Sequence, residues 1–416
     1  MGSGSSHNET PRVTVRSLAH KSTGTFWLIV VIAAIPAFLE GFDSNLYVFG
    51  SPIIVHQIHG AVSLLATAAS GYAAGIAIFS IVGGYLFDRF SVKYVVIGSV
   101  AFFTAFTLLT GFVRTPAELL VVRTLVGVGI GVFQPAILAL LGDMVFETRG
   151  RAVSAFAVFF GGGLLAGPYL IAPFLPHYQI PFIISGLASL AGLIVFYLVI
   201  PKTYKTLDRT KIALAGVFTR NVIFLSLSIL FFGIALFGVS SYFSDYLLKF
   251  LLLPKIEAAT IVGMTGLGGL VCAFPIGFLA DRLGRKTGVT VSAGLVMIGG
   301  VGLFIVSRNV AALIVLTLAF GAGRGIYASL VAALGQDSVD DAIAGSVTGW
   351  LFLVFNLGAF LGGPIFASLL SHGFATAGFL TVGLSSVLAL LLTLLTRPIR
   401  QSNIVDQEVA APPMPG

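Results

Sequence analysis

The segment GFLADRLGRK occupies residues 277–286, and a related segment, GYLFDRFSVK, occupies residues 84–93. Each segment follows a long apolar stretch and contains an Asp-Arg pair. The two aspartates, Asp88 and Asp281, lie 193 residues apart. The chain is therefore predicted to consist of two similar halves that carry the same short motif at the same place.

Long apolar stretches surround both segments and recur from Phe26 to Thr396. Of the 416 residues, 57% are hydrophobic and only 9% are charged, and the mean hydropathy is +1.03. A soluble domain carries about 25% charged residues, so the solvent of this chain is expected to be a lipid bilayer. A helix needs about 20 apolar residues to cross it. The predicted fold is an all-α integral membrane protein whose twelve transmembrane helices form two pseudo-symmetric six-helix halves. The expected spans are 24–55, 62–87, 94–112, 117–141, 152–173, 180–200, 221–248, 259–280, 288–306, 310–335, 343–370 and 374–396.

The basic residues predict the orientation in a cell membrane. With a cytoplasmic N-terminus, seventeen of the 23 Lys and Arg residues fall on the cytoplasmic side, which is the bias of the positive-inside rule. The predicted organisation is a cytoplasmic tail (1–23), a six-helix half (24–200), a basic cytoplasmic linker (201–220), a second six-helix half (221–396) and a cytoplasmic tail (397–416).

Other classes of protein are disfavoured. The net charge of +7 is spread over many loops instead of one patch, so no nucleic-acid partner is expected. The single cysteine, Cys272, lies in an apolar run, is interpreted as packing and permits no intramolecular disulfide. The histidines in the predicted outer loops are too scattered for a metal site. Without a phosphate-binding loop or a nucleophile motif, the sequence predicts no cofactor, no catalysis and no ATP-driven transport.

The repeated segments resemble the G-x-x-x-D-R-x-G-R-K motif of the major facilitator superfamily. Residues 277–286 match it fully, whereas 84–93 has Ser91 in place of glycine and Val92 in place of a basic residue. The resemblance covers essentially the whole chain. It implies a secondary transporter, by default a monomer, whose halves rock about a binding site near the membrane midplane.

Narrower features resemble particular branches of that superfamily. EGFD at 40–43 is similar to the acidic-G-[FY]-D signature of proton symporters for aromatic acids, sialic acid and related organic anions, and its G-[FY]-D part also occurs in sugar porters. The fourth-span run RTLVGVGIG at 123–131 and the loop with Asp143 and Arg149 resemble those groups too. The sugar porters' P-E-S-P-R is absent after the sixth span, and GLLAGP at 163–168 partly matches an antiporter motif. The branch therefore stays open.

Charged side chains within a span predict function, because each costs at least about 2.5–3.5 kcal/mol at the bilayer centre. Asp43 lies near the middle of the first span, with Glu40 one turn earlier on the same face. A carboxylate that moves between apolar surroundings and a cation binds and releases a proton. Asp43, Glu40 and Arg123 are therefore predicted to couple protons, with Arg123 as the partner of Asp43. The alternatives are a fixed structural ion pair and an arginine that snorkels to the outer interface.

Arg324 lies deep in the tenth span between glycines, with no acidic residue near it in sequence. Its guanidinium is predicted to bind a carboxylate or phosphate of the substrate; a structural pair with another helix and a gating role are the alternatives. The 36 phenylalanines are interpreted as lipid-facing or packed. Tyr327, one turn after Arg324, and Tyr47, one turn after Asp43, are further candidates for substrate binding. The remaining candidates, each with packing or interfacial anchoring as its alternative, are Asn45, Tyr72, Trp350 and Asn356, and Gln134 has packing between helices as its alternative.

Paired charges at the predicted cytoplasmic helix ends are candidates for a gate. They would hold the halves together in the outward-open state and separate on inward opening. Positive-inside topology explains the basic residues of these pairs but not aspartates at matching positions. The predicted gating residues are Asp88, Arg89, Asp143, Arg149, Asp281 and Arg282.

The sequence thus predicts proton-coupled symport of a small organic solute, and the expected class is an organic anion such as an aromatic or other carboxylic acid. In the expected cycle, Asp43 takes up a proton from outside and loosens its hold on Arg123, and substrate binds near Arg324. A sugar symporter, a drug/proton antiporter and a membrane sensor that binds ligand without flux are the alternatives. The predicted partners are protons, the solute and the lipid bilayer.

Overall fold

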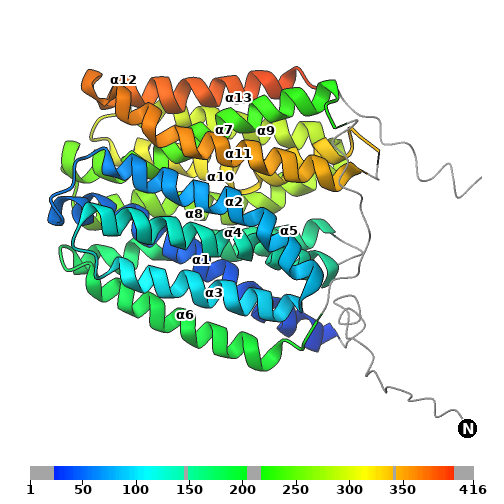
Figure 1. The fold of residues 1–416 in the computed structure, drawn as a ribbon. Coiled ribbons are helices and arrows are strands. Elements are labelled where there is room, and N and C mark those ends of the chain that lie inside the picture. The colour runs from blue at the N-terminus through cyan, green and yellow to red at the C-terminus, as the bar shows by residue number, and fades with distance from the viewer. Residues whose placement is uncertain (1–22, 145–148, 204–216, 341–342, 398–416) are drawn as a thin grey trace, which may run out of the picture.

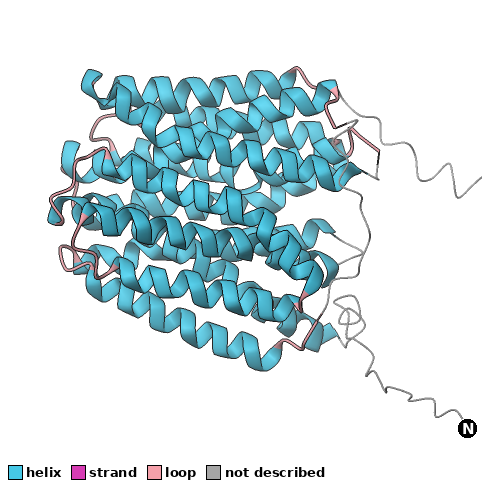
Figure 2. Ribbon diagram, in the orientation of Figure 1, coloured by secondary structure: helices cyan, strands magenta, loops and turns pink. Residues whose placement is uncertain are grey.

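The computed structural model describes residues 23–144, 149–203, 217–340 and 343–397. Within these ranges the chain is helical, with short connections and no strand (Figure 2). Residues 1–22 and 398–416 of the predicted tails, and residues 204–216 of the predicted linker, lie outside the described residues.

The helices run side by side, and Figure 1 shows most of the first half in its lower part and most of the second half in its upper part, with α2 and α8 near the middle. The first half contains α1 (Thr23–Gln57), α2 (Leu64–Arg89), α3 (Val92–Thr110), α4 (Pro116–Met144), α5 (Arg149–Ile171) and α6 (Gln179–Val199). The second half contains α7 (Arg220–Asp245), α8 (Lys255–Leu283), α9 (Arg285–Gly302), α10 (Val310–Gln336), α11 (Ala344–Leu369), α12 (Phe374–Gly378) and α13 (Leu384–Leu394).

Each of the twelve predicted spans corresponds to helix in the described ranges. Eleven of these stretches are long and apolar enough to cross a membrane, and one of them combines α12, a π-helical turn and α13. The remaining helix, α9, is the least apolar of the long helices, because its 18 residues include Arg285, Lys286 and several glycines. The predicted all-α membrane fold is confirmed.

The two halves repeat the same helix crossings. In the first half α1 packs on α5 and α2 on α4, and in the second half α7 packs on α11 and α8 on α10. A Cβ added to Gly41 would lie 2.1 Å from the carbonyl oxygen of Phe160, and one added to Gly358 would lie 2.1 Å from that of Leu230. Small residues allow such close backbone contact between helices in lipid. The repeat seen in the sequence is therefore also present in the packing.

The halves contact each other mainly through α5 with α8 and α2 with α11. Several hydrogen bonds cross between them toward the end of the bundle that holds the α1–α2 loop, which is the predicted outer end. Ser70 Oγ donates to the carbonyl oxygen of Phe360 (2.6 Å), Tyr169 Oη to Thr260 Oγ1 (3.2 Å) and Lys255 Nζ to the carbonyl oxygen of Leu175 (2.6 Å). At this end, the two halves are therefore closed against each other.

The apolar core follows the same pattern. One buried cluster extends through the second half and into the first half at the predicted outer end. It includes Phe49 of α1 and Phe243 of α7. A second cluster, with Ile29 and Phe196, belongs to the opposite end of the first half. A polar-lined cavity remains between the halves at mid-depth.

Candidate functional site

A cavity of about 250 Å³ lies between the two halves. Helices α1, α2, α4 and α5 line it from the first half, and α7, α10 and α11 line it from the second. Its size is just below the roughly 300–1,000 Å³ of typical ligand pockets. The cavity therefore suits a small solute.

Eight of the side chains predicted to couple protons or bind substrate line this cavity. These residues come from α1, α2, α4, α10 and α11, and polar or charged groups predominate among them. They are Glu40, Asn45, Tyr47, Tyr72, Arg123, Gln134, Arg324 and Asn356.

Glu40 forms a polar link between α1 and α4 at the cavity wall. Gln134 Nε2 donates a hydrogen bond of 2.6 Å to Glu40 Oε1, and Glu40 is 1% exposed. The second carboxylate oxygen, Oε2, has no hydrogen-bond partner in the described part of the chain. The cavity wall thus contains a carboxyl group with one oxygen that accepts a hydrogen bond and one oxygen that accepts none from the described residues.

Asp43 does not line the cavity, although it lies one turn from Glu40. Its Oδ1 accepts a hydrogen bond from the hydroxyl of Ser185 on α6, and the residue is 2% exposed. Its Oδ2 has no partner among the described residues. Ser185 was not among the sequence candidates, because a serine in an apolar span carries no signal that distinguishes a functional hydroxyl from a packed one.

Arg123 contacts aromatic rings. Its guanidinium carbon lies 3.8 Å from the ring centroid of Tyr47 and 5.1 Å from that of Tyr72, which are cation–π distances. Its Nε and Nη1 have no hydrogen-bond partner among the described residues. Between Asp43 and Arg123, both of which are described, no ion pair within 4.0 Å is formed. The direct pair expected from the sequence is therefore absent from this conformation.

Arg324 reaches the cavity because the glycines around it let α10 approach its neighbours. A Cβ added to Gly321 would lie 2.2 Å from the carbonyl oxygen of Thr265 on α8, and one added to Gly323 would lie 2.3 Å from that of Ser292 on α9. In the described ranges, no hydrogen bond or ion pair holds the Arg324 guanidinium. A cation in this position is available to an anionic ligand.

Two of the predicted substrate-binding residues are not part of the cavity lining. The hydroxyl of Tyr327 lies 2.5 Å from Ser228 Oγ, and its ring is buried against Phe232. Trp350 donates from Nε1 to Ser226 Oγ at 2.9 Å. Both side chains pack within the second half, which was the alternative interpretation of Trp350.

Phenylalanines contribute a large part of the lining and were not expected there from the sequence. Six of the 36 phenylalanines line the cavity, and nothing in the sequence separates these six from the other thirty. The six are Phe156, Phe160, Phe232, Phe237, Phe352 and Phe355. Four serines of the lining, Ser44, Ser51, Ser240 and Ser241, were also missed.

The predicted gating residues lie at helix ends away from the cavity. Asp281 and Arg282 are exposed at the end of α8, and the Arg282 guanidinium lies 4.2 Å from the ring centroid of Phe278. Arg89 similarly lies over Tyr85, at 4.5 Å. The side chains of Asp88, Asp143 and Arg149 lie outside what the structure describes.

A neighbouring motif residue does form an ion pair. Arg285 Nη1 lies 2.5 Å from Asp337 Oδ1, and this pair joins α9 to the end of α10 within the second half. The gating role of the paired charges stays a prediction.

Comparisons with known proteins agree with this architecture. The family described as Major Facilitator Superfamily matches residues 33–363 and 256–413 in two overlapping segments. A gallate transporter of Pseudomonas putida is 25% identical, with 83% of this chain and 86% of the relative covered. The 4-hydroxybenzoate transporter PcaK of Pseudomonas putida is 24% identical, with 83% and 87% covered.

Among solved structures, a point mutant of the nucleoside transporter NupG matches with a TM-score of 0.74 and 14% identity, covering 89% of this chain and 100% of that chain. At this identity the match supports the fold alone. The family match, in contrast, extends over most of the chain. The chain is thus a membrane-embedded transporter of a small molecule and belongs to the Major Facilitator Superfamily.

Proposed function

We propose that this transporter is a proton-coupled symporter of an aromatic carboxylate. The observation that carries the proposal is the Arg324 guanidinium, which lines a cavity at the centre of the molecule without an anionic partner in the described part of the chain. Arg324 is half-buried, and a cation withdrawn from water without a counter-ion is costly. A substrate carboxylate that binds it in a two-pronged geometry would supply that counter-ion.

The walls of the cavity favour an aromatic body on the substrate. Six phenylalanines and Tyr72 surround the polar groups, and aromatic pairs contribute about 0.5–1.5 kcal/mol beyond the burial of their area. The small volume fits a single ring with few substituents. The relatives that transport gallate and 4-hydroxybenzoate support the same substrate class.

Proton coupling is proposed for Glu40, Asp43 and Arg123. Glu40 and Asp43 each have a buried carboxylate oxygen without a hydrogen-bond partner, and a proton on each would remove the cost of burying a charge. Glu40 faces the cavity, so it can exchange a proton with solvent that enters with the substrate. Asp43 lies one turn from Glu40 on α1 and contacts α6. A change of conformation would bring its carboxylate to Arg123.

Alternating access is proposed to use the contacts between the halves. The hydrogen bonds of Ser70, Tyr169 and Lys255 close the predicted outer end, which is the arrangement expected of an inward-facing state. The paired charges Asp88 with Arg89, Asp143 with Arg149 and Asp281 with Arg282 are proposed to close the opposite end in the other state. Both termini are proposed to lie in the cytoplasm, and the functional unit is proposed to be a monomer.

The antiporter alternative loses its main support. A Cβ added to Gly163 would lie 2.1 Å from the carbonyl oxygen of Phe38, so this glycine is required for the packing of α5 on α1. The GLLAGP run at 163–168 thus has a structural reason that is independent of the direction of transport. No feature of the described residues favours a sugar over an aromatic ring.

The test is uptake by purified protein in proteoliposomes. An inward proton gradient should drive accumulation of 4-hydroxybenzoate or gallate, but not of the neutral 4-hydroxybenzyl alcohol. Arg324→Gln should abolish uptake of the acids, and Arg324→Lys, which keeps the charge, should retain part of it. Equal uptake of acid and alcohol, or an unaffected Arg324→Gln variant, would contradict the proposal.

A further inference from the structure

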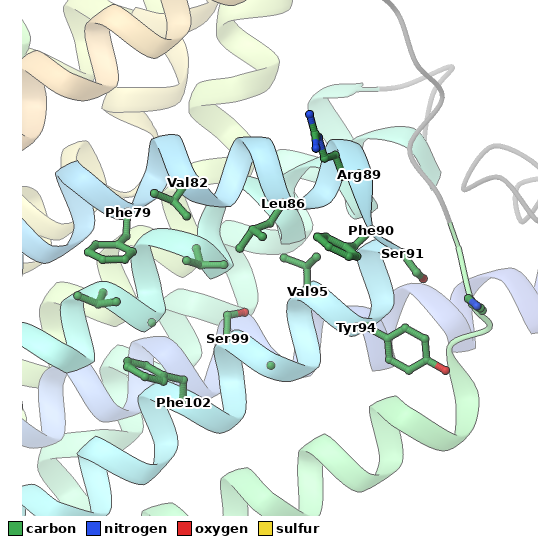
Figure 3. A pocket seen from close by; sticks show the side chains of 15 residues that line it. Phe79, Val82, Leu86, Arg89, Phe90, Ser91, Tyr94, Val95, Ser99 and Phe102 are labelled. Carbon is green, nitrogen blue, oxygen red and sulfur yellow. The ribbon is translucent and has the colours of Figure 1, made fainter.

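A second hollow lies on the outside of the first half, away from the central cavity. It is a groove of about 620 Å³ between α2 and α3, with α4 as its floor (Figure 3). The groove exists because α2 and α3 each pack on α4 but hardly touch each other. Leu86 of α2 and Val95 of α3 are among the side chains that face into it (Figure 3).

The groove opens toward the hydrocarbon that surrounds the transmembrane helices. Val82, Phe90 and Tyr94 line it and are exposed on the outer surface of the bundle. Deeper in the groove the lining is almost entirely apolar, and the hydroxyl of Ser99 is satisfied by the carbonyl oxygen of Val96 in its own helix (3.0 Å). An occupant of this part needs no polar groups, and it would reach the groove from the bilayer.

One end of the groove is cationic. Arg89 at the end of α2 and Lys202 after α6 line it there, and they are the charged side chains among its described lining residues. The Lys202 ammonium lies 5.8 Å from the ring centroid of Tyr94, which also lines the groove. The carbonyl oxygen of the next residue, Thr203, accepts hydrogen bonds from the backbone N–H of Val92 (2.9 Å) and from Ser91 Oγ (2.8 Å), and so holds the chain at the start of α3. This end is the predicted cytoplasmic one, where a lipid headgroup would lie.

We propose that this groove is a binding site for an anionic phospholipid, with an acyl chain between α2 and α3 and the phosphate near Arg89 and Lys202. Hydrocarbon gains little by moving from the bilayer into an apolar groove. The preference for an anionic lipid therefore comes from the two cations, and the groove determines where the chain lies. The site is separate from the substrate cavity, and no residue lines both.

The test is native mass spectrometry of the purified protein in detergent, titrated with phosphatidylglycerol or with phosphatidylcholine of the same acyl chains. Each cation near a membrane surface contributes about fivefold in affinity for anionic lipid. Phosphatidylglycerol should bind roughly 25-fold more tightly than phosphatidylcholine. The double variant Arg89→Gln with Lys202→Gln should bind the two lipids equally.

A second pair of variants tests the position of the chain. A Cβ added to Gly98, in the wall of the groove, or to Gly294 on α9 would meet nothing within 4 Å, so both positions have room for a side chain to begin. Gly98→Leu would fill the groove and should weaken binding of both lipids, whereas Gly294→Leu should bind them like the wild type. Equal binding of the two lipids by the wild type would overturn the proposal. Unchanged phosphatidylglycerol binding by Gly98→Leu would overturn it as well.

Discussion

Gly266 on α8 faces Gly161 on α5 where the two halves meet, and this contact leaves no room for a side chain. A Cβ added to Gly266 would lie 2.4 Å from the carbonyl oxygen of Gly161, which is backbone and cannot move aside alone. Overpacking of this kind costs about 1–3 kcal/mol. The substitution Gly266→Ala would impose that cost on the conformation that is closed at the predicted outer end, and much less on one in which the halves have separated there.

The population ratio of the two conformations should therefore shift by about 5- to 150-fold toward the one that is open at the outer end. The assay is double electron–electron resonance between spin labels on His177→Cys and Ile256→Cys, at the outer ends of the two halves, in a Cys272→Ala background. Gly266→Ala should lengthen the distance between the labels. Gly294→Ala, where an added Cβ meets nothing within 4 Å, should leave the distribution unchanged. If the distances in Gly266→Ala equal those in the labelled protein without this substitution, the contact of Gly266 with Gly161 does not control closure of the outer end.

Three further predictions concern the cavity. Glu40→Gln should abolish proton-driven accumulation in proteoliposomes while exchange of labelled for unlabelled substrate continues; loss of both would mean that Glu40 serves binding instead of coupling. Asp43→Asn should make the rate of exchange independent of external pH between 5 and 8, and a retained pH dependence would place the coupled proton elsewhere. Tyr47→Leu should destabilise the protein by about 2 kcal/mol through loss of the Arg123 cation–π contact. Tyr47→Phe should be as stable as the wild type, because the Tyr47 hydroxyl has no hydrogen-bond partner among the described residues. Thermal unfolding in detergent measures the stability of both variants. Equal losses of stability in Tyr47→Leu and Tyr47→Phe would contradict the cation–π interpretation.

The sequence is most informative about the spans and the charges within them. A charge in lipid is costly, so the positions of Glu40, Arg123 and Arg324 within apolar spans are enough to predict that they face a cavity. The repeated motif also identifies the ninth span, although α9 is the least apolar of the long helices. These predictions rest on the energetics of the bilayer, which depend little on how the helices pack.

The contacts of each side chain could not be predicted in the same way. Tyr327 follows Arg324 by three residues on α10, yet Arg324 lines the cavity while Tyr327 packs against Ser228 of α7. Asp43 likewise contacts Ser185, which is 142 residues away in sequence. Spacing along one helix does not specify which neighbouring helix a side chain meets.

The attachment of Thr203 to the start of α3 also bears on the mechanics of the whole molecule. The chain is held to the first half at Thr203 and is next described at Val217, fourteen residues later. A segment of that length can reach about 46–50 Å when extended, far more than a rocking motion requires. By covalent length alone, the connection between Thr203 and Val217 permits the two halves to separate by up to that distance. A transporter assembled from two separately expressed halves is therefore expected to cycle.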